Sequence, residues 1–270
     1  MHRDSLLNWV NQQMIRGRNI FTKEDVKSLG LLQTDDSLNT ALSRLVSKGV
    51  IVSPWQNFYV TVPTEYRLKG KVPPSFYIDK LMTYLGHNYY VSLLSAAALN
   101  GAGHQRSMVF QVTADGGQIR SANRNGVRLE FTLRSKIPFA FIQKVKTQMG
   151  YMNVSSPELT ALDIVDDEEK VGGLSRVTEV LAELAESMHF GDDKADLIMF
   201  FNTPVIQRLG YLLNLISENE LADNLLKLAQ QKGKTFRKVR LKQSKQQSDD
   251  MPIDKKWKII INQKIEIDEL

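Results

Sequence analysis

Two amphipathic segments near the N-terminus constrain the fold more strongly than any other feature of this chain. Apolar residues recur at helical spacing over residues 5–15 and again over 35–48. The first segment stops at Gly17 and the second at Gly49, and glycine is the residue that most often ends a helix. Both segments are therefore expected to be short helices that bury one face.

The residues around these segments complete a recognisable order of elements. Thr22 and Asp25 have the spacing of a capping box, which predicts a third short helix between the other two. Residues 50–62 contain two strand-like runs around a polar Pro-Trp-Gln-Asn turn, which predicts a β-hairpin. Three helices followed by a hairpin predict a winged helix-turn-helix domain over residues 1–62.

The rest of the chain is expected to form a second, mixed α/β domain. Residues 63–75 contain three prolines and a glycine and are expected to be a linker, so that the second domain spans residues 76–270. The fold class is therefore α+β. Strands are expected at 108–114, 117–122, 127–134 and 150–155, with an antiparallel pairing around the DGG and NRNG turns, and a late strand at 257–261. Helices are expected at 76–85, 89–101, 138–147, 156–168, 174–189, 195–216 and 218–231.

The composition points to a cytoplasmic protein without a membrane partner. The sequence contains no cysteine, which excludes disulfides, thiolate metal sites and cysteine nucleophiles and fits a reducing compartment. The first 17 residues lack the apolar core of a signal peptide. No uninterrupted apolar run approaches the ~18 residues that a membrane-spanning helix needs.

Charge is distributed in blocks along the chain. The net charge is +5, but residues 103–150 carry +6, residues 155–200 carry −9 and residues 227–247 carry +8. Basic blocks favour a partner that bears phosphate groups. Solvated helix faces and a mobile basic tail would explain the same pattern.

The helix expected at residues 35–48 carries the most specific functional hypothesis. In a helix-turn-helix, residues near the start of the recognition helix read base edges while neighbouring polar residues hold phosphates. Asn39 could contact adenine and Arg44 a guanine or a phosphate. The hairpin turn could add a contact to the DNA backbone or the minor groove. The candidate DNA-binding residues are Ser37, Asn39, Thr40, Ser43, Arg44, Gln56 and Asn57. Alternatively, the domain binds a protein and never touches DNA.

The two basic blocks supply a second set of candidates, for DNA or for an acidic partner. Arg128 and Arg134 lie six residues apart and would share one face of a strand. A solubilising surface would account for the same residues. This basic surface comprises Arg106, Arg120, Arg124, Arg128, Arg134, Lys136, Lys234, Arg237, Lys238 and Arg240.

The sequence offers no convincing catalytic site, and no metal or cofactor is expected. The four histidines lack the spacing of metal ligands, and no phosphate-binding glycine loop or serine nucleophile motif occurs. The carboxylates of residues 163–170 are expected to form a solvated helix face. Asp115, Glu130 and Lys136 could form a nuclease-like trio. A DNA-binding enzyme, either a metal-dependent nuclease or an enzyme that modifies another protein, is therefore the alternative function.

One segment resembles a known family. The run Tyr89-Tyr-Val-Ser-Leu-Leu-Ser-Ala-Ala-Ala-Leu-Asn-Gly-Ala-Gly-His-Gln, followed by Val109-Phe-Gln-Val-Thr, resembles the AbiEi antitoxins of type IV toxin–antitoxin systems. The resemblance extends over most of the chain and includes the closing segment from Trp257 to Asn262. Asn100 stands where many relatives have histidine.

The resemblance implies a bacterial antitoxin with two functions. The winged helix would bind inverted repeats in double-stranded DNA of its own promoter and repress transcription. The C-terminal domain would neutralise an AbiEii-type nucleotidyltransferase toxin without forming a stable complex. Such systems are associated with abortive infection and phage defence, and the antitoxin is not expected to be an enzyme. The basic segment around residues 242–248 would be an insertion or a flexible arm of this branch of the family.

Overall fold

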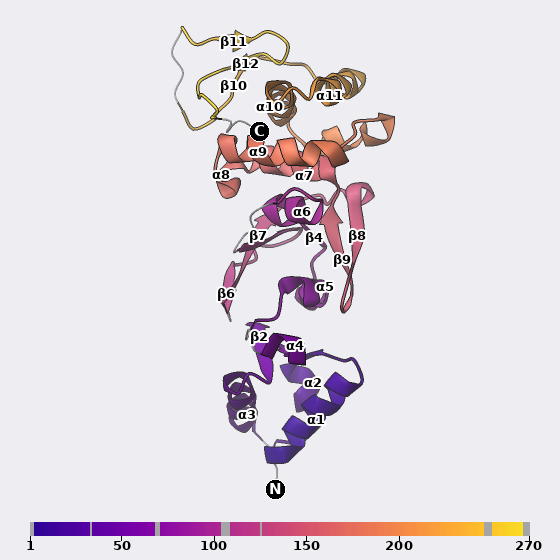
Figure 1. The fold of residues 1–270 in the computed structure, drawn as a ribbon. Coiled ribbons are helices and arrows are strands. Elements are labelled where there is room, and N and C mark those ends of the chain that lie inside the picture. Colours follow the sequence, from indigo (N-terminus) through magenta and orange to yellow (C-terminus); the bar gives the residue numbers. More distant parts are fainter. Residues whose placement is uncertain are drawn as a thin grey trace.

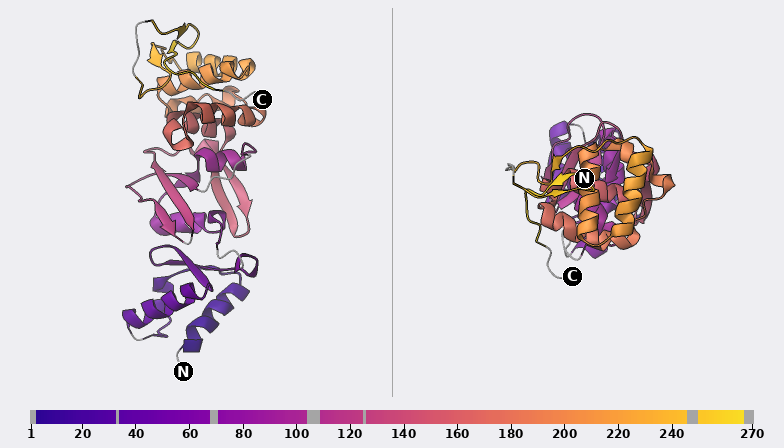
Figure 2. Two further views of the ribbon diagram at one scale, coloured as in Figure 1. Left: turned by 60° about the vertical axis from the view of Figure 1, so that its left-hand side comes forward. Right: turned by 90° about the horizontal axis from the view of Figure 1, so that it is seen from above.

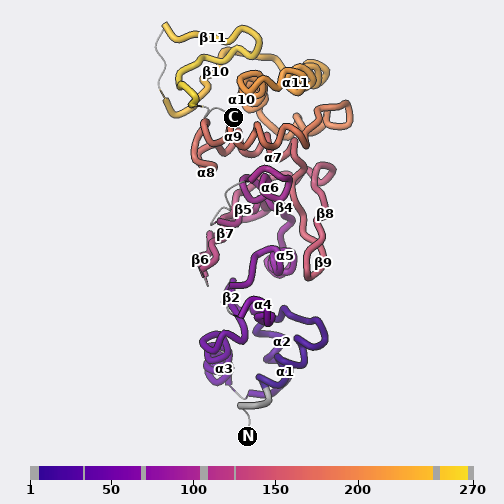
Figure 3. The backbone as a smooth tube through the Cα atoms, in the orientation of Figure 1, coloured from indigo at the N-terminus to yellow at the C-terminus, as the bar shows by residue number. Residues whose placement is uncertain are grey.

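The protein forms three tiers stacked along one axis, and the chain passes through them in sequence order (Figures 1 and 3). The computed structural model describes residues 3–32, 34–67, 71–103, 109–124, 126–245 and 250–266. The N-terminal tier lies at one end, a β-sheet tier follows, and a helical tier occupies the other end (Figure 2). Helices and strands are both abundant, which confirms the predicted α+β class.

The N-terminal tier has three helices and a small sheet, an arrangement that is compatible with the expected winged helix-turn-helix. Strand β3 lies between β1 and β2, and both pairings are antiparallel. Leu6, Val10, Val26 and Leu42 pack between the helices and the sheet. The elements are α1 (Arg3–Ile15), β1 (Ile20–Thr22), α2 (Lys23–Lys27), α3 (Asp35–Ser47), β2 (Ile51–Trp55) and β3 (Phe58–Thr61).

The middle tier is built on a six-stranded mixed sheet with the strand order β6-β7-β5-β4-β9-β8. The pairs β5–β7 and β4–β9 are parallel and the remaining pairs are antiparallel. The strands are β4 (Tyr89–Val91), β5 (Val109–Ala114), β6 (Ala122–Arg124), β7 (Val127–Leu133), β8 (Ile142–Thr147) and β9 (Gly150–Ser155). The helical pieces are α4 (Thr64–Arg67), η1 (Pro74–Phe76), α5 (Ile78–Leu85), α6 (Leu93–Leu99) and η2 (Phe139–Phe141).

Three expectations for this tier are wrong, and the expected antiparallel pairing is confirmed only across the NRNG turn. Residues 89–101 are not one helix, because Tyr89–Val91 forms the fully buried strand β4 and α6 begins only at Leu93. Residues 138–147 form a 3₁₀ turn and strand β8 instead of a helix. The strand expected at 117–122 covers 122–124. The long strands around the DGG and NRNG turns are parallel to each other, and only the short β6 pairs antiparallel with β7.

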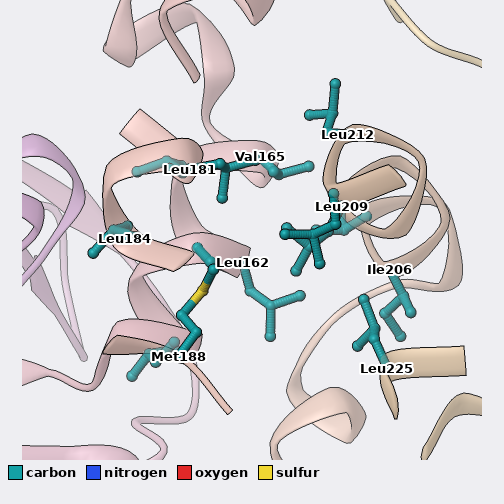
Figure 4. Close-up of a cluster of buried hydrophobic side chains, with 14 of the residues drawn as sticks. Leu162, Val165, Leu181, Leu184, Met188, Ile206, Leu209, Leu212 and Leu225 are labelled. Atoms are coloured by element: carbon teal, nitrogen blue, oxygen red, sulfur yellow. The ribbon is translucent and has the colours of Figure 1, made fainter. Parts of the chain in front are cut away.

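The helical tier packs its helices around a core of leucine, isoleucine and valine side chains, part of which is shown in Figure 4. Leu162 and Val165 of α7 meet Leu209 of α10 in this core. The helices are α7 (Pro157–Asp166), α8 (Glu168–Val171), α9 (Leu174–Leu184), α10 (Thr203–Leu215) and α11 (Asn219–Gln231). Short 3₁₀ turns occur at η3 (Ala185–Ser187), η4 (Asp192–Lys194) and η5 (Leu197–Phe200).

The basic segment near the C-terminus was expected to be a flexible arm or an insertion. In the part that the structure describes, it is folded onto the helical tier. Its strands β10 (Val239–Arg240), β12 (Ile259–Ile260) and β11 (Ile253–Asp254) form a small sheet in that order. Trp257 is fully buried, and its indole N–H donates to Asn214 of α10 at 2.8 Å. The indole ring occupies the space beside Gly210, where a Cβ atom would come within 2.1 Å of it. A glycine is therefore needed at position 210 for this segment to dock.

Neighbouring tiers are joined by shared hydrophobic cores. Val52, Phe58 and Val60 of the N-terminal hairpin are buried in the core of the middle tier. On the other side of the six-stranded sheet, Tyr90 and Leu93 are buried in the core of the helical tier. The N-terminal sheet and the six-stranded sheet therefore bury side chains on both faces, so each tier is packed against the next.

Candidate nucleic-acid interface

Helix α3 presents a row of polar side chains on the surface of the N-terminal tier. Asn39, Thr40, Ser43 and Arg44 are exposed, while Leu38, Leu42 and Leu45 are buried on the opposite face. This separation follows from the 3.6-residue period of the helix. The structure thus places four of the predicted DNA-binding residues on one outward face.

Ser37 has a different position from these four residues. The helix is capped by Thr34, whose hydroxyl accepts a hydrogen bond from the Ser37 amide at 3.2 Å. The Ser37 hydroxyl in turn accepts a hydrogen bond from the Thr34 amide at 3.3 Å. This capping box satisfies donors that the first turn of the helix would otherwise leave open. Ser37 therefore fixes the start of α3.

One of the two carboxylates at the start of α3 pairs with lysines of α2. The Asp35 carboxylate lies 2.9 Å from Lys27 Nζ and 3.4 Å from Lys23 Nζ. The hydrogen bond from Lys27 and the two nearby charges lower the pKa of Asp35. The pairing reduces the repulsion that this carboxylate would exert on a phosphate group, and it ties the two helices together.

A groove of about 590 Å³ runs beside α3. Leu6, Leu7 and Leu32 line it together with Thr40 and Arg44. Two of the exposed polar residues thus border an apolar groove, so this face of α3 combines hydrogen-bonding groups with aliphatic surface.

The hairpin turn lies against the middle tier. The Trp55 ring meets Phe131 of β7 edge to face, with centroids 5.9 Å apart. Asn57 has a positive φ of 60°, is half-buried, and its carbonyl accepts a hydrogen bond from the Lys23 amide at 2.9 Å. Gln56 is exposed. Its side chain is free to reach solvent, whereas Trp55 and Asn57 take part in internal contacts.

The predicted basic surface divides into exposed and engaged residues. The exposed members are Arg120, Arg124, Arg128, Lys136, Arg237 and Lys238. Arg128 is paired with Glu130 at 2.5 Å on the same face of β7. Arg124 lies on β6, next to the hairpin of the N-terminal tier, and its charge acts on Tyr59. Arg106 lies outside the described residues.

Arg134 does not belong to an exposed face, which corrects the expectation that it shares one with Arg128. Its guanidinium lies 2.7 Å from the carboxylate of Asp163, donates to the Phe200 carbonyl at 3.3 Å, and stacks over the Phe201 ring at 4.3 Å. Asp163 is itself buried, although residues 163–170 were expected to be solvated. Burial raises the pKa of Asp163 to about 7, and the Arg134 charge opposes this shift.

Two further members of the basic set also have structural bonds. The Lys234 ammonium donates to the Phe201 carbonyl at 3.0 Å, and Arg240 donates to the Lys245 carbonyl at 3.0 Å. Both side chains are half-buried. These bonds close the connection between α11 and the small C-terminal sheet.

The nuclease-like trio is not assembled. Asp115 follows the end of β5 and accepts hydrogen bonds from the backbone and side-chain N–H groups of Asn88. Glu130 is opposite Gln111 in the β5–β7 register, and Gln111 lies four residues before Asp115. At about 3.3 Å per residue, roughly 13 Å of strand separates it from Asp115. Among the residues that the structure describes, no cluster of three potential metal ligands occurs.

Two polar groups inside the fold were not predicted from the sequence. Tyr90 is buried, and its hydroxyl lies 3.4 Å from Asp163 in the same network as Arg134. Arg208 of α10 lies at the border of two cavities in the helical tier. The sequence does carry a signal for the burial of Asp163, because most of its neighbours in residues 157–165 are apolar. No helix in the described part of the chain has the length and apolar character needed to cross a bilayer.

Comparisons with known proteins place this architecture. Over most of its length the fold is similar to the crystal structure of the RV2827C protein from Mycobacterium tuberculosis. The TM-score is 0.65, the sequences are 14% identical, and the alignment covers 93% of this chain and 88% of the other. At this identity the likeness concerns the fold alone. No curated protein sequence matches the chain.

A family model identifies the central part of the chain. Residues 90–215 match the AbiEi antitoxin C-terminal domain. This range extends from β4 to the end of α10, so it contains most of the six-stranded sheet and the core of the helical tier. A cognate toxin is the partner that this family implies. The chain therefore carries an AbiEi antitoxin C-terminal domain over residues 90–215, which supports an antitoxin of a toxin–antitoxin system.

Proposed function

We propose that this antitoxin represses its own operon by binding inverted repeats in the promoter DNA through α3. The observation that carries the proposal is the outward row of Asn39, Thr40, Ser43 and Arg44 on a helix whose start is fixed by a capping box. A fixed helix can place an amide and a guanidinium against base edges. Arg120 and Arg124 would add phosphate contacts beside the N-terminal tier.

We propose further that the antitoxin domain neutralises a nucleotidyltransferase toxin of the AbiEii type, as a cytoplasmic protein of a type IV system that acts in phage defence. Neutralisation would need no catalysis by the antitoxin and no stable complex. The support is the AbiEi domain match over residues 90–215.

A mobility-shift titration tests the DNA-binding half. The probe is the DNA directly upstream of the gene, in excess non-specific competitor and at two salt concentrations. A discrete shift should weaken steeply with salt, because neutralised phosphates release counterions. Arg44→Ala should weaken operator binding by about 1–3 kcal/mol.

The matched control is Lys227→Ala, which removes one positive charge from an exposed position on α11, at the opposite end of the molecule. Its operator affinity should equal that of the unmodified chain. If Arg44→Ala binds the operator as tightly as the control, α3 is not the reading element. If the unmodified chain gives no competitor-resistant shift, the N-terminal tier does not recognise this DNA.

A growth assay separates the two halves. The double variant Asn39→Ala/Arg44→Ala should lose repression of a promoter–reporter fusion but still protect cells that express the cognate toxin, because it leaves the antitoxin domain unchanged. Loss of protection by a folded double variant would refute the assignment of neutralisation to that domain. A requirement for a nucleotide or a divalent metal in a purified neutralisation assay would favour an enzyme instead.

A further inference from the structure

A cavity of about 350 Å³ opens at the start of α10, at the end of the molecule opposite α3 (Figure 1). Arg208, Lys238 and Arg240 line it, together with Asn202 and Asp166. Three cations and one carboxylate give this small volume a net charge of +2. The cavity is therefore electrostatically suited to an anion, unlike the acidic surface beside it.

Arg208 is the central residue of this cavity. It is half-buried, and its Nε donates to the backbone carbonyl of Arg240 at 3.0 Å. Within the described part of the chain no carboxylate lies within 4.0 Å of its guanidinium, in contrast to Arg134. This bond uses Nε and leaves the terminal N–H groups of the planar guanidinium, which can bind two phosphate oxygens at once.

The burial of Arg208 makes its charge costly, which favours the binding of an anion beside it. Burial lowers the pKa of Arg208, and the neighbouring Arg240 charge acts in the same direction, while Asp166 and Glu168 oppose it. Placing two arginines together inside a partly enclosed space costs free energy unless an anion lies between them. The start of the 13-residue helix α10 adds its partial positive charge to the same cavity.

The small volume of the cavity and the carboxylates beside it favour a small ligand over a nucleic-acid strand. An adjoining cavity of about 290 Å³ is lined by Asp166, Asp167, Glu168 and Glu169, and it also borders Arg208. A phosphodiester strand laid across this surface would meet all four carboxylates, whereas a single phosphate group in the cavity at Arg208 would face Asp166 alone. We propose that the cavity at Arg208 binds the terminal phosphate group of a small molecule, either an inorganic polyphosphate or a nucleotide.

Isothermal titration calorimetry on the full-length chain tests this site. The probes are inorganic pyrophosphate, ADP and a duplex of about 20 base pairs without operator sequence, each in chloride buffer at constant ionic strength. Pyrophosphate or ADP should bind with 1:1 stoichiometry. Arg208→Met should weaken that binding at least about tenfold, because a charged hydrogen-bond donor pair is lost. ADP binding much tighter than pyrophosphate would identify a nucleotide, and equal binding would identify the phosphate group alone.

Two further variants keep the test decisive. Lys238→Ala changes an exposed side chain and should also weaken binding, so the result does not depend on whether Arg208→Met folds, which circular dichroism would report. Lys136→Ala, an exposed lysine outside this cavity, is the control and should bind as the unmodified chain does. Absence of binding up to about 5 mM of either small probe, or binding of the duplex alone, would overturn the proposal. So would unchanged affinity in a folded Arg208→Met. None of these outcomes depends on whether α3 binds DNA.

Discussion

Replacing Arg134 with methionine should destabilise the protein in a way that depends on pH. Methionine keeps much of the aliphatic volume but removes the charge that faces the buried Asp163. Without its partner the buried carboxylate takes up a proton, and above the folded-state pKa of about 7 this proton uptake adds at most about 1.4 kcal/mol per pH unit to the cost of the substitution. At low pH the carboxylate is protonated, so the substitution should cost only the neutral contacts, on the order of 1–2 kcal/mol.

The direction of the pH dependence follows from the pKa of Asp163. Its folded-state pKa is about 7, raised by burial against the opposing Arg134 charge, and the ordinary value is 3.8. The folded protein therefore binds this proton more tightly than the unfolded chain, and the stability that the group contributes declines as pH rises from about 4 to about 7. Removing Arg134 raises the pKa further, so the loss in the variant should be larger at pH 8 than at pH 5.

Urea unfolding followed by the fluorescence of Trp257 measures this loss in the helical tier. The other two tryptophans, Trp9 and Trp55, would be replaced by phenylalanine in all variants so that one emitter remains. Arg120→Met is the control, because it makes the same substitution at an exposed position. A loss below about 1 kcal/mol at pH 8, or an equal loss at both pH values, would refute the account of Asp163 as a buried carboxylate that needs its partner.

Two further substitutions test the packing and the capping described above. Gly210→Ala should lower the free energy of unfolding by about 1–3 kcal/mol, because the new methyl group overlaps the Trp257 ring. Gly117→Ala is the control, because its methyl group meets no atom within 4 Å and should have no effect. Equal melting temperatures of the two variants would contradict this packing. Thr34→Ala should cost about 0.5–2 kcal/mol and speed amide hydrogen exchange in the first turn of α3, and unchanged exchange there would show that the capping box does not hold the helix.

Local patterns predicted the elements that have one buried face. The periodicity of 35–48 gave α3 to within a residue, and the alternation in 127–134 gave β7. The pattern failed where burial is two-sided or where the strand is mostly exposed. Tyr89–Val91 is buried on both faces, so it has no alternation and merges with the helix that follows. Ile142–Thr147 is an edge strand with few buried residues, and its sequence does not distinguish it from a helix.

The candidate sites show a similar limit. Exposure of Asn39 and Arg44 could be derived from the helix period alone. The role of Arg134 could not, because its partner Asp163 is 29 residues away and belongs to another tier. Charge counting placed both residues on surfaces, one basic and one acidic. Their pairing depends on the packing of α7 over the end of β7, which local sequence does not encode.

The hydrophobic cores between the tiers limit how the functions of this protein can be separated by truncation. A truncation at residue 62, the expected domain boundary, would strip the hairpin from the middle tier and leave the apolar side chains that pack on Val52, Phe58 and Val60 facing water. A fragment cut there would tend to aggregate for reasons unrelated to DNA or toxin. Separation of its activities therefore has to come from surface substitutions in the intact chain.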